Sequence, residues 1–317
     1  MSRLEALALT TGGPDLTVAI VTPSHAPDFL RFRRLHESVV ANVSEDVMHY
    51  VLVPPPDVTK FSSISSSQLS VLRQPDVLPK SFLATTAFGR LPLLPRGYRI
   101  AAINLRKPWP PIRGWVLQQL VKLAFVSQLD CDVALMIDSD VLLVRGFTTE
   151  TFCREGSVRH YRVPGAVHSG MTRHLSWRHT AARLLGLDGP SEDLADYNAG
   201  VISWSPRVVR DLLARIEQVS SQDWATVVGS QLDVSEYFLY GEFLAALGDP
   251  KDRAFTSDEN LCHSYWGTMT IAGVKDFVAS TPAQDIAILV QSNSDTSESV
   301  LAYIASQVRG DPDPSTE

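Results

Sequence analysis

Hydrophobic and polar positions follow two alternating periods along the chain. Short apolar runs rich in β-branched residues are typical of buried strands. Such runs predict strands at residues 16–22, 49–53, 68–72, 133–137, 201–204 and 286–290. Longer segments with apolar positions three and four apart predict helices over residues 28–43, 113–128, 205–219, 236–247 and 299–308. Strands that alternate with helices in this way indicate an α/β fold with a mixed, mostly parallel sheet flanked by helices.

Three segments lack this pattern. Residues 78–111 are long and proline-rich, and loops of that length in compact domains are usually functional or mobile. Residues 1–15 are expected to be a flexible leader, and residues 310–317, with two prolines and no apolar residue, a disordered tail. The chain between them, residues 16–309, is expected to form a single domain.

Composition excludes several classes of protein. Of the 317 residues, 44% are hydrophobic and 20% are charged, which are ordinary values for a globular protein. The net charge of −7 argues against nucleic-acid binding, which normally requires a basic surface. No apolar run approaches the ~18–20 residues of a membrane span, and the N-terminus lacks the apolar core of a secretion signal. Three widely spaced cysteines suggest reduced thiols, so the sequence predicts a cytoplasmic protein.

The most informative segment is ALMIDSDVLLV, residues 134–144. One apolar run leads into Asp138, Ser139 and Asp140, and a second apolar run follows. Two carboxylates two positions apart point to the same side of an extended chain, and beside a hydrophobic strand they need a positive partner. Hard divalent cations such as Mg²⁺ and Mn²⁺ prefer carboxylate oxygens. Asp138 and Asp140 are therefore predicted to hold a metal that bridges the phosphates of a nucleotide.

Two other interpretations of this segment stay open. Asp and Ser favour turns, so a plain surface turn after a strand would look similar, although the apolar residues 141–144 argue against an exposed turn. Haloacid-dehalogenase phosphatases also place Asp-x-Asp after a strand. They carry it near the N-terminus, usually with Thr or Val where this chain has Leu142.

Four motifs occur in a defined order along the chain. They are Asp138-Ser139-Asp140, Tyr197-Asn198-Ala199-Gly200, Ser235-Glu236-Tyr237 and the segment HSYWG that begins at His263. In this order the chain resembles a GT-A-fold glycosyltransferase over residues 16–267. The resemblance is greatest to a group of bacterial glycosyltransferases that carry Gly-Trp-x-x-Gln-Gln-x-x-Lys-Leu, here residues 114–123, and Ser-Glu-Tyr-x-x-Tyr-Gly, here residues 235–241.

The resemblance implies a Rossmann-like GT-A domain with a nucleotide-binding half, residues 16–145, and an acceptor-side half, residues 146–309. It implies sugar transfer, of hexosyltransferase type, from a nucleotide sugar to a small-molecule or glycan acceptor. A UDP-sugar is the expected donor, contacted by Asp138 and Ser139 among others, and Mn²⁺ or Mg²⁺ is the expected cofactor. A catalytically idle nucleotide-binding protein of the same fold would carry the same motifs, so that alternative stays open.

The resemblance assigns further donor contacts to the first half of the chain. Thr22, Pro23 and Ser24 close the first strand, where GT-A proteins place the base and ribose of the nucleotide. Gln119 and Lys122 are three residues apart on one helical face. Because Lys122 lies in an apolar stretch, its ammonium group either meets the donor diphosphate or extends past the helix rim to water.

The later motifs supply the remaining candidates. Asn198 and Gly200 lie in a loop expected under the donor sugar, although a glycine there also suits a plain turn. His263 is expected to complete the metal site through a neutral imidazole, against the alternative of a structural histidine. Glu236, in the first turn of a helix, is the candidate general base of an inverting transfer, or orients the acceptor if configuration is retained. Its alternative role is a small stabilisation of the helix dipole. The aromatic residues expected to wall the acceptor are Tyr197, Tyr237, Tyr240 and Trp266.

Overall fold

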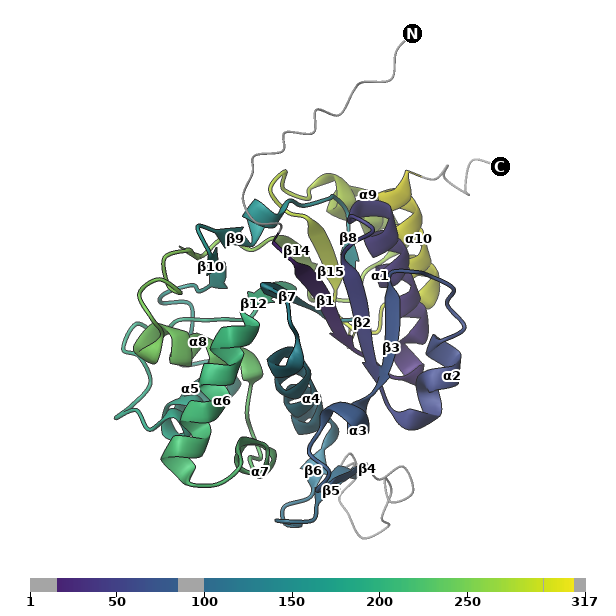
Figure 1. Ribbon diagram of the computed structural model, residues 1–317. Coiled ribbons are helices and arrows are strands. Elements are labelled where there is room, and N and C mark those ends of the chain that lie inside the picture. Colours follow the sequence, from purple (N-terminus) through teal and green to yellow (C-terminus); the bar gives the residue numbers. More distant parts are fainter. Residues whose placement is uncertain (1–15, 85–99, 293, 311–317) are drawn as a thin grey trace.

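The computed structural model describes residues 16–84, 100–292 and 294–310, and a five-stranded sheet lies at its centre (Figure 1). The strand order is β12-β7-β1-β2-β3. These strands are β1 (Val18–Pro23), β2 (Met48–Val53), β3 (Leu69–Arg73), β7 (Val133–Ile137) and β12 (Val201–Trp204). All neighbours are parallel except β12, which is antiparallel to β7. The predicted α/β fold with a mostly parallel sheet is confirmed.

A second, three-stranded sheet has the order β14-β15-β8. Its strands are β8 (Val141–Leu143), β14 (Cys262–Tyr265) and β15 (Ala287–Val290). The apolar residues after the Asp-Ser-Asp motif do not continue strand β7. The chain turns at residues 138–140, where Val141 N–H donates to the Asp138 carbonyl at 3.2 Å, and then enters the other sheet as β8. The two predicted halves of the chain therefore share both sheets.

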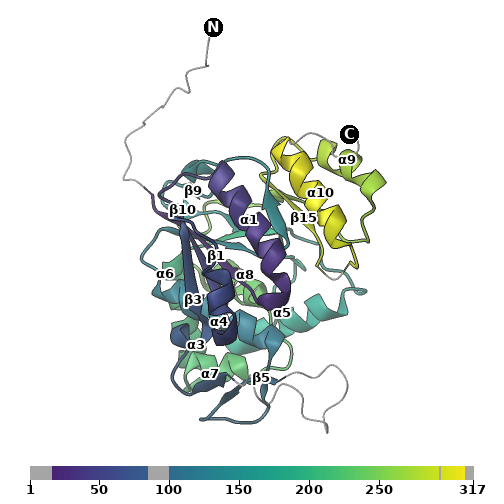
Figure 2. The same cartoon turned by 90° about the vertical axis from the view of Figure 1, so that its right-hand side faces the viewer.

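Every residue of β7 is buried, because helices cover both faces of the central sheet. Ala134 and Met136 lie in the same hydrophobic cluster as side chains of α4 (Gly114–Gln128). Leu135 and Ile137 lie in the cluster that holds side chains of α1 (Phe29–Asn42). Successive side chains of a strand point to opposite faces, so a strand covered on both faces is apolar throughout. Figure 2 shows α1 beside α10 (Glu298–Arg309), which comes from the C-terminal end of the chain.

The remaining helices and strands have the following bounds. The further helices are α2 (Val58–Phe61), α3 (Gln74–Val77), α5 (Thr172–Leu185), α6 (Pro206–Ser220), α7 (Trp224–Gly229), α8 (Glu236–Leu247) and α9 (Ile271–Ala279). Short 3-10 turns lie at Ala26–Asp28, Pro55–Asp57 and Thr149–Thr151. The further strands are β4 (Phe82–Ala84), β5 (Ile100–Asn104), β6 (Ile112–Arg113), β9 (Cys153–Arg154), β10 (Ser157–Val158), β11 (His160–Tyr161) and β13 (Thr256–Ser257). No helix within the described ranges combines the length and apolar character needed to cross a bilayer.

Several of these elements were not predicted from the sequence. The expected long loop at residues 78–111 contains the antiparallel strands β4 and β5, and residues 85–99 lie outside the described part. Helices α5, α7 and α9 and strand β14 were also missed. The predicted leader, residues 1–15, and residues 311–317 of the predicted tail lie outside the described residues.

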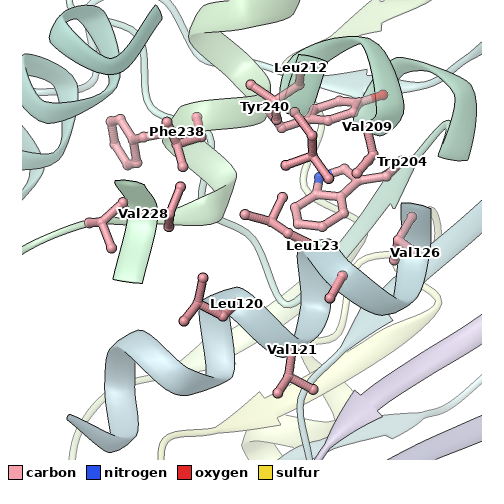
Figure 3. Packing of buried hydrophobic residues seen from close by; sticks show 14 of the residues in the cluster. Leu120, Val121, Leu123, Val126, Trp204, Val209, Leu212, Val228, Phe238 and Tyr240 are labelled. Atoms are coloured by element: carbon pink, nitrogen blue, oxygen red, sulfur yellow. The ribbon is translucent and has the colours of Figure 1, made fainter. Parts of the chain in front are cut away.

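The largest hydrophobic cluster joins α4 to α6, α8 and β12 (Figure 3). Ten residues of α4 are buried, and they lie on all sides of the helix. Leu120 and Leu123 of α4 share this cluster with Phe238 of α8 and with Trp204, which is fully buried. A helix buried all round keeps any charged group on it away from water, and this applies to Lys122.

Gly241 in α8 explains the glycine of the Ser-Glu-Tyr-x-x-Tyr-Gly motif. A Cβ atom at this position would lie 2.2 Å from Cδ1 of Tyr197, whose ring is itself 2% exposed. We therefore expect Gly241→Ala to lower the free energy of unfolding by about 3 kcal/mol, the upper end of the usual range for overpacking. Urea denaturation followed by circular dichroism measures this change. Gly114→Ala, at the first residue of α4 where no atom lies within 4 Å of the added Cβ, should not destabilise the protein. Equal effects of the two substitutions would contradict the steric explanation.

Candidate functional site

The predicted Asp-Ser-Asp motif forms the turn that ends β7 at the carboxyl edge of the central sheet. The Asp138 side chain is 51% exposed, whereas Ser139 is buried and Asp140 is half-buried. Ligands of parallel α/β sheets bind outside this edge, near the point where the strand order reverses. β7 lies next to β1 near the middle of the sheet, so the motif is at the expected place for a ligand site.

Asp140 is held by a backbone group from a distant part of the chain. Its Oδ2 accepts a hydrogen bond from the Ser292 N–H at 3.0 Å. Burial, and after it the nearby charge of Asp138, raise the pKa of the Asp140 carboxyl to about 6. Two carboxylates placed so that one disfavours ionisation of the other fit a divalent cation, which would compensate both charges.

Lys122 of α4 is buried beside the motif. Its side chain is 4% exposed, and Nζ lies 3.0 Å from Asp138 Oδ1 and 3.0 Å from Glu236 Oε1. Nζ also donates to Tyr237 Oη at 3.0 Å. Burial alone would lower the pKa of Lys122, but the charges of Asp138 and Glu236 raise it well above its usual value. The ammonium group thus has two carboxylates and one hydroxyl around it, and Lys122 acts as an internal cation. It does not extend past the helix rim to water.

Glu236 is the first residue of α8 and is 1% exposed. Its backbone N–H donates to Gln119 Oε1 at 3.2 Å, so Gln119 satisfies one free donor at this helix start. Burial raises the pKa of the Glu236 carboxyl, and the charge of Lys122 opposes this effect. Both carboxylate oxygens of Glu236 are buried and have no hydrogen-bond partner among the described residues, so Oε1 meets Lys122 as an ion pair. In this conformation Lys122 compensates the Glu236 carboxylate, which has no open path to an acceptor hydroxyl.

Thr22 lies inside the protein and fixes the end of β7. Its hydroxyl donates to the Ile137 carbonyl at 2.6 Å, directly before Asp138. Since that proton is used, His49 Nε2 donates to Thr22 Oγ1 at 2.9 Å, which leaves His49 Nδ1 to accept from His36 Nδ1 at 3.0 Å. Thr22 therefore belongs to a buried chain of hydrogen bonds that leads to the motif, and its contact with a nucleotide stays a prediction.

The buried histidine in this series of hydrogen bonds makes the free energy of unfolding depend on pH. Burial lowers the pKa of His49 well below that of a free histidine, and the neighbouring His36 lowers it further. Below about pH 6.5 the unfolded chain takes up a proton that folded His49 does not, so stability falls as pH falls. We expect His49 to contribute up to about 1.4 kcal/mol per pH unit below that point.

The pH dependence of the urea midpoint tests this expectation. In His49→Gln the amide still donates to Thr22 but does not titrate, so the dependence between about pH 6.5 and 5 should be flatter. His179→Gln replaces an exposed histidine and should keep the wild-type slope. Parallel slopes for wild type and His49→Gln would refute the role of His49.

The other residues predicted at the end of β1 are also internal. Pro23 is the last residue of β1 and pairs with Leu52. The Ser24 side chain is 1% exposed, and its Oγ accepts from Ser139 Oγ at 2.9 Å. Ser24, directly after β1, therefore holds the middle of the Asp-Ser-Asp turn. The hydroxyls of Ser24 and Ser139 bind each other in this structure.

The loop before β12 brings two predicted residues to the same edge, because Val201 pairs with Ile137. Asn198 is half-buried, and its side-chain amide lies 3.0 Å from His174 Nε2. Gly200 is required by close packing. A Cβ there would lie 2.5 Å from Cys262 Sγ in β14. The glycine thus lets the two sheets approach each other beside the motif.

His263 lies in β14, one strand beyond β15 from β8. Its ring stacks on Phe277 with 4.8 Å between centroids, and its Nε2 lies 3.3 Å from Ser280 Oγ. In the described part of the chain, no three His, Cys, Asp or Glu side chains form a group that could hold a metal. The structure does not bring His263 together with Asp138 and Asp140, and its role as a ligand stays a prediction.

The predicted acceptor aromatics are in different surroundings. Tyr197 and Tyr240 are 2% and 3% exposed. Tyr240 Oη accepts from the Ser205 N–H at 3.1 Å, and burial raises the pKa of Tyr197 to about 12. Both rings are core residues that do not face solvent. Trp266, which follows β14, is 70% exposed and is free to meet a ligand.

Sequence reasoning missed several groups around the motif. Ser292 binds Asp140 through its backbone, and Arg31 and Arg34 of α1 line one pocket together with Ser139 and Asp140. Ser292 is 152 positions from Asp140, and a backbone contact leaves no signal in the sequence. The two arginines lie three residues apart on α1, so they share a face of this helix. That spacing was a usable signal.

Three solved structures resemble the fold at low identity. An apo structure of WbbM, a bifunctional glycosyltransferase, has a TM-score of 0.45 and 13% identity, over 89% of this chain and 46% of that chain. An active-site mutant of LgtC has a TM-score of 0.44 and 14% identity, over 92% and 95%. The galactosyltransferase LgtC in complex with donor and acceptor sugar analogues has a TM-score of 0.43 and 11% identity, over 91% and 95%. This chain thus spans less than half the length of WbbM, and TM-scores this low carry no chemistry over to it.

Two comparisons of the sequence complete the picture. No curated protein matches the chain. A family model described as "Family of unknown function (DUF6492)" matches residues 16–297, which are most of the chain and include both sheets and the Asp-Ser-Asp turn. The chain therefore belongs to this family.

Proposed function

We propose that the protein is a metal-dependent glycosyltransferase that uses a nucleotide-sugar donor, with a UDP-sugar as the first candidate. The observation that carries the proposal is the pair of carboxylates, Asp138 and Asp140, on the turn that closes β7 at the ligand-binding edge of the sheet. The order of the four sequence motifs supports the same activity, since it is the order found in GT-A glycosyltransferases.

In this proposal Asp138 and Asp140 hold Mn²⁺ or Mg²⁺. A bound divalent ion would offset the charge that develops on the departing nucleoside diphosphate. The residues of this chain keep the two carboxylates in place. Ser292 N–H holds Asp140, Lys122 holds Asp138, and Thr22 fixes the carbonyl directly before the motif. His263 is retained as a candidate third ligand that would have to move from its contact with Ser280.

The donor and acceptor contacts are revised by burial. Lys122 acts on the donor through Asp138, because its buried ammonium group is already surrounded by Asp138, Glu236 and Tyr237. Asn198, half-buried at the same edge, remains a candidate donor contact, and Gly200 provides the close approach of the two sheets. Trp266 is the exposed candidate for the acceptor, a small molecule or a glycan.

Release of nucleoside diphosphate from a panel of nucleotide sugars, with Mn²⁺ or with EDTA, tests this function. The proposal predicts release of the diphosphate only with metal, and mass spectrometry identifies where the sugar goes. Binding without release would favour the catalytically idle alternative. Release of inorganic phosphate from a simple phosphate ester, with no action on any nucleotide sugar, would favour the phosphatase.

A further inference from the structure

Three carboxylates and one ammonium group form a charged cluster around the Asp-Ser-Asp turn. Lys122 Nζ is 3.0 Å from an oxygen of Asp138 and 3.0 Å from an oxygen of Glu236, and Asp140 follows two residues after Asp138. With the carboxylates ionised, the cluster carries two net negative charges. That charge equals the charge of one divalent cation with the opposite sign.

We propose that Glu236 is the counter-ion of Lys122, and that by cancelling the lysine charge it leaves Asp138 and Asp140 free to balance one divalent cation. The inference rests on the proposed metal site. It makes Glu236 a positioning residue that acts on the metal through Lys122, in place of a base that touches the acceptor.

Burial is the first reason for this assignment. Glu236 is 1% exposed and the Lys122 side chain 4%, so water cannot compensate either charge and each needs the other. Asp138 is 51% exposed on its side chain and can meet a ligand from solvent. The buried pair of Lys122 and Glu236 therefore contacts the exposed Asp138 carboxylate from the interior of the protein.

The geometry of Lys122 is the second reason. Nζ lies 3.0 Å from Asp138 Oδ1, 3.0 Å from Glu236 Oε1 and 3.0 Å from Tyr237 Oη, so oxygen atoms of three residues surround it. Lys122 engages Oδ1 of Asp138 and leaves Oδ2 as the oxygen available to a cation. If Glu236 lost its charge, the lysine would neutralise Asp138 and the metal would face one net negative charge.

The two arginines that line the pocket beside Asp140 have acidic partners of their own. Arg31 lies 3.5 Å from Asp28, and Arg34 is paired with Glu298 of α10. These two pairs also cancel, so they leave the charge at the two aspartates unchanged. The balance at the metal site therefore depends on the Lys122–Glu236 pair.

Titration of Mn²⁺ in the presence of UDP, with free Mn²⁺ measured by electron paramagnetic resonance, tests the inference. Glu236→Gln should weaken Mn²⁺ binding on the order of ten- to a hundredfold, because Lys122 then neutralises Asp138 and the site loses one net negative charge. The double variant Lys122→Met/Glu236→Gln restores the net charge and should recover binding to within about threefold of wild type. Near-UV circular dichroism establishes that each variant is folded.

Glu242→Gln is the matched control. Glu242 lies on the same helix, is fully buried, and is 3.6 Å from Arg178, so this variant loses a buried pair away from the turn. Its Mn²⁺ affinity should equal that of wild type. Wild-type affinity in Glu236→Gln, or a double variant as weak as Glu236→Gln, would overturn the inference while leaving the metal site intact. A wild-type protein that does not bind Mn²⁺ would refute the proposed function itself.

Discussion

Replacing Lys122 with methionine should lower the free energy of unfolding by about 3–5 kcal/mol, the usual effect of removing one partner of a buried ion pair. The substitution keeps the length and apolar character of the side chain inside α4. It leaves Glu236, which is 1% exposed, as an uncompensated buried carboxylate, and removes a donor from Tyr237. Urea denaturation at pH 7, followed by far-UV circular dichroism, measures the loss.

Two further variants show whether the loss of stability comes from the unpaired Glu236 carboxylate. Lys107→Met replaces an exposed lysine and should change stability by no more than about 0.5 kcal/mol. Lys122→Met/Glu236→Gln removes both charges and should regain most of the lost stability, since the glutamate is no longer left unpaired. A Lys122→Met protein as stable as wild type would mean that Lys122 is not the internal cation described above.

Asp138→Asn and Asp140→Asn should each weaken Mn²⁺-dependent nucleotide binding by at least about 100-fold. Losing even an outer partner of a metal site costs about 10–100-fold, and these side chains are the proposed ligands. Asparagine keeps the shape of each side chain, and its oxygen can still accept from Lys122 or from the Ser292 N–H. The fold should therefore survive, and calorimetry with UDP and Mn²⁺ measures the loss of binding.

Asp132→Asn provides the control at the other end of the same strand. Asp132 precedes β7 and accepts hydrogen bonds from the backbone and hydroxyl of Thr17 at 2.8 and 2.9 Å, at the amino edge of the sheet. This variant should bind nucleotide and metal as wild type does. Nucleotide affinity that is the same in all three variants would remove Asp138 and Asp140 from the site.

Strong local patterns made the central elements predictable. The apolar run VALMI, the helix that begins at Pro206 and the apolar helix after Ser235 appear within a few residues of their predicted bounds. The missed elements have weaker local signals. β14 reads CHSY, too short a run to show a strand pattern, and its place depends on pairing with β15. Helix α5 mixes charged and apolar residues. Its N-cap residue is Met171, whose side chain makes no capping hydrogen bond, so the sequence gives no signal for the start of the helix.

The candidate site was predictable where one residue type carries the chemistry. Asp138 and Asp140 stand out because carboxylates interrupt an apolar stretch. Thr22, Ser24, Tyr197 and Tyr240 are buried, because polar and aromatic residues near a strand end serve the interior equally well, and their contacts with ligands stay predictions. Lys122 lies 114 positions from Glu236 and 16 from Asp138. Pairing over such separations is set by the fold, so the role of Lys122 became evident only from the structure.

Calorimetric titration of UDP, GDP and ADP into the wild-type chain, with Mn²⁺ and then with EDTA, tests the proposed function most directly. The account predicts saturable binding of at least one of these nucleotides, UDP first, with Mn²⁺, and at least tenfold weaker binding once EDTA removes the metal. Binding that is equally tight in EDTA, or no binding of any of the three nucleotides with Mn²⁺ present, would contradict it.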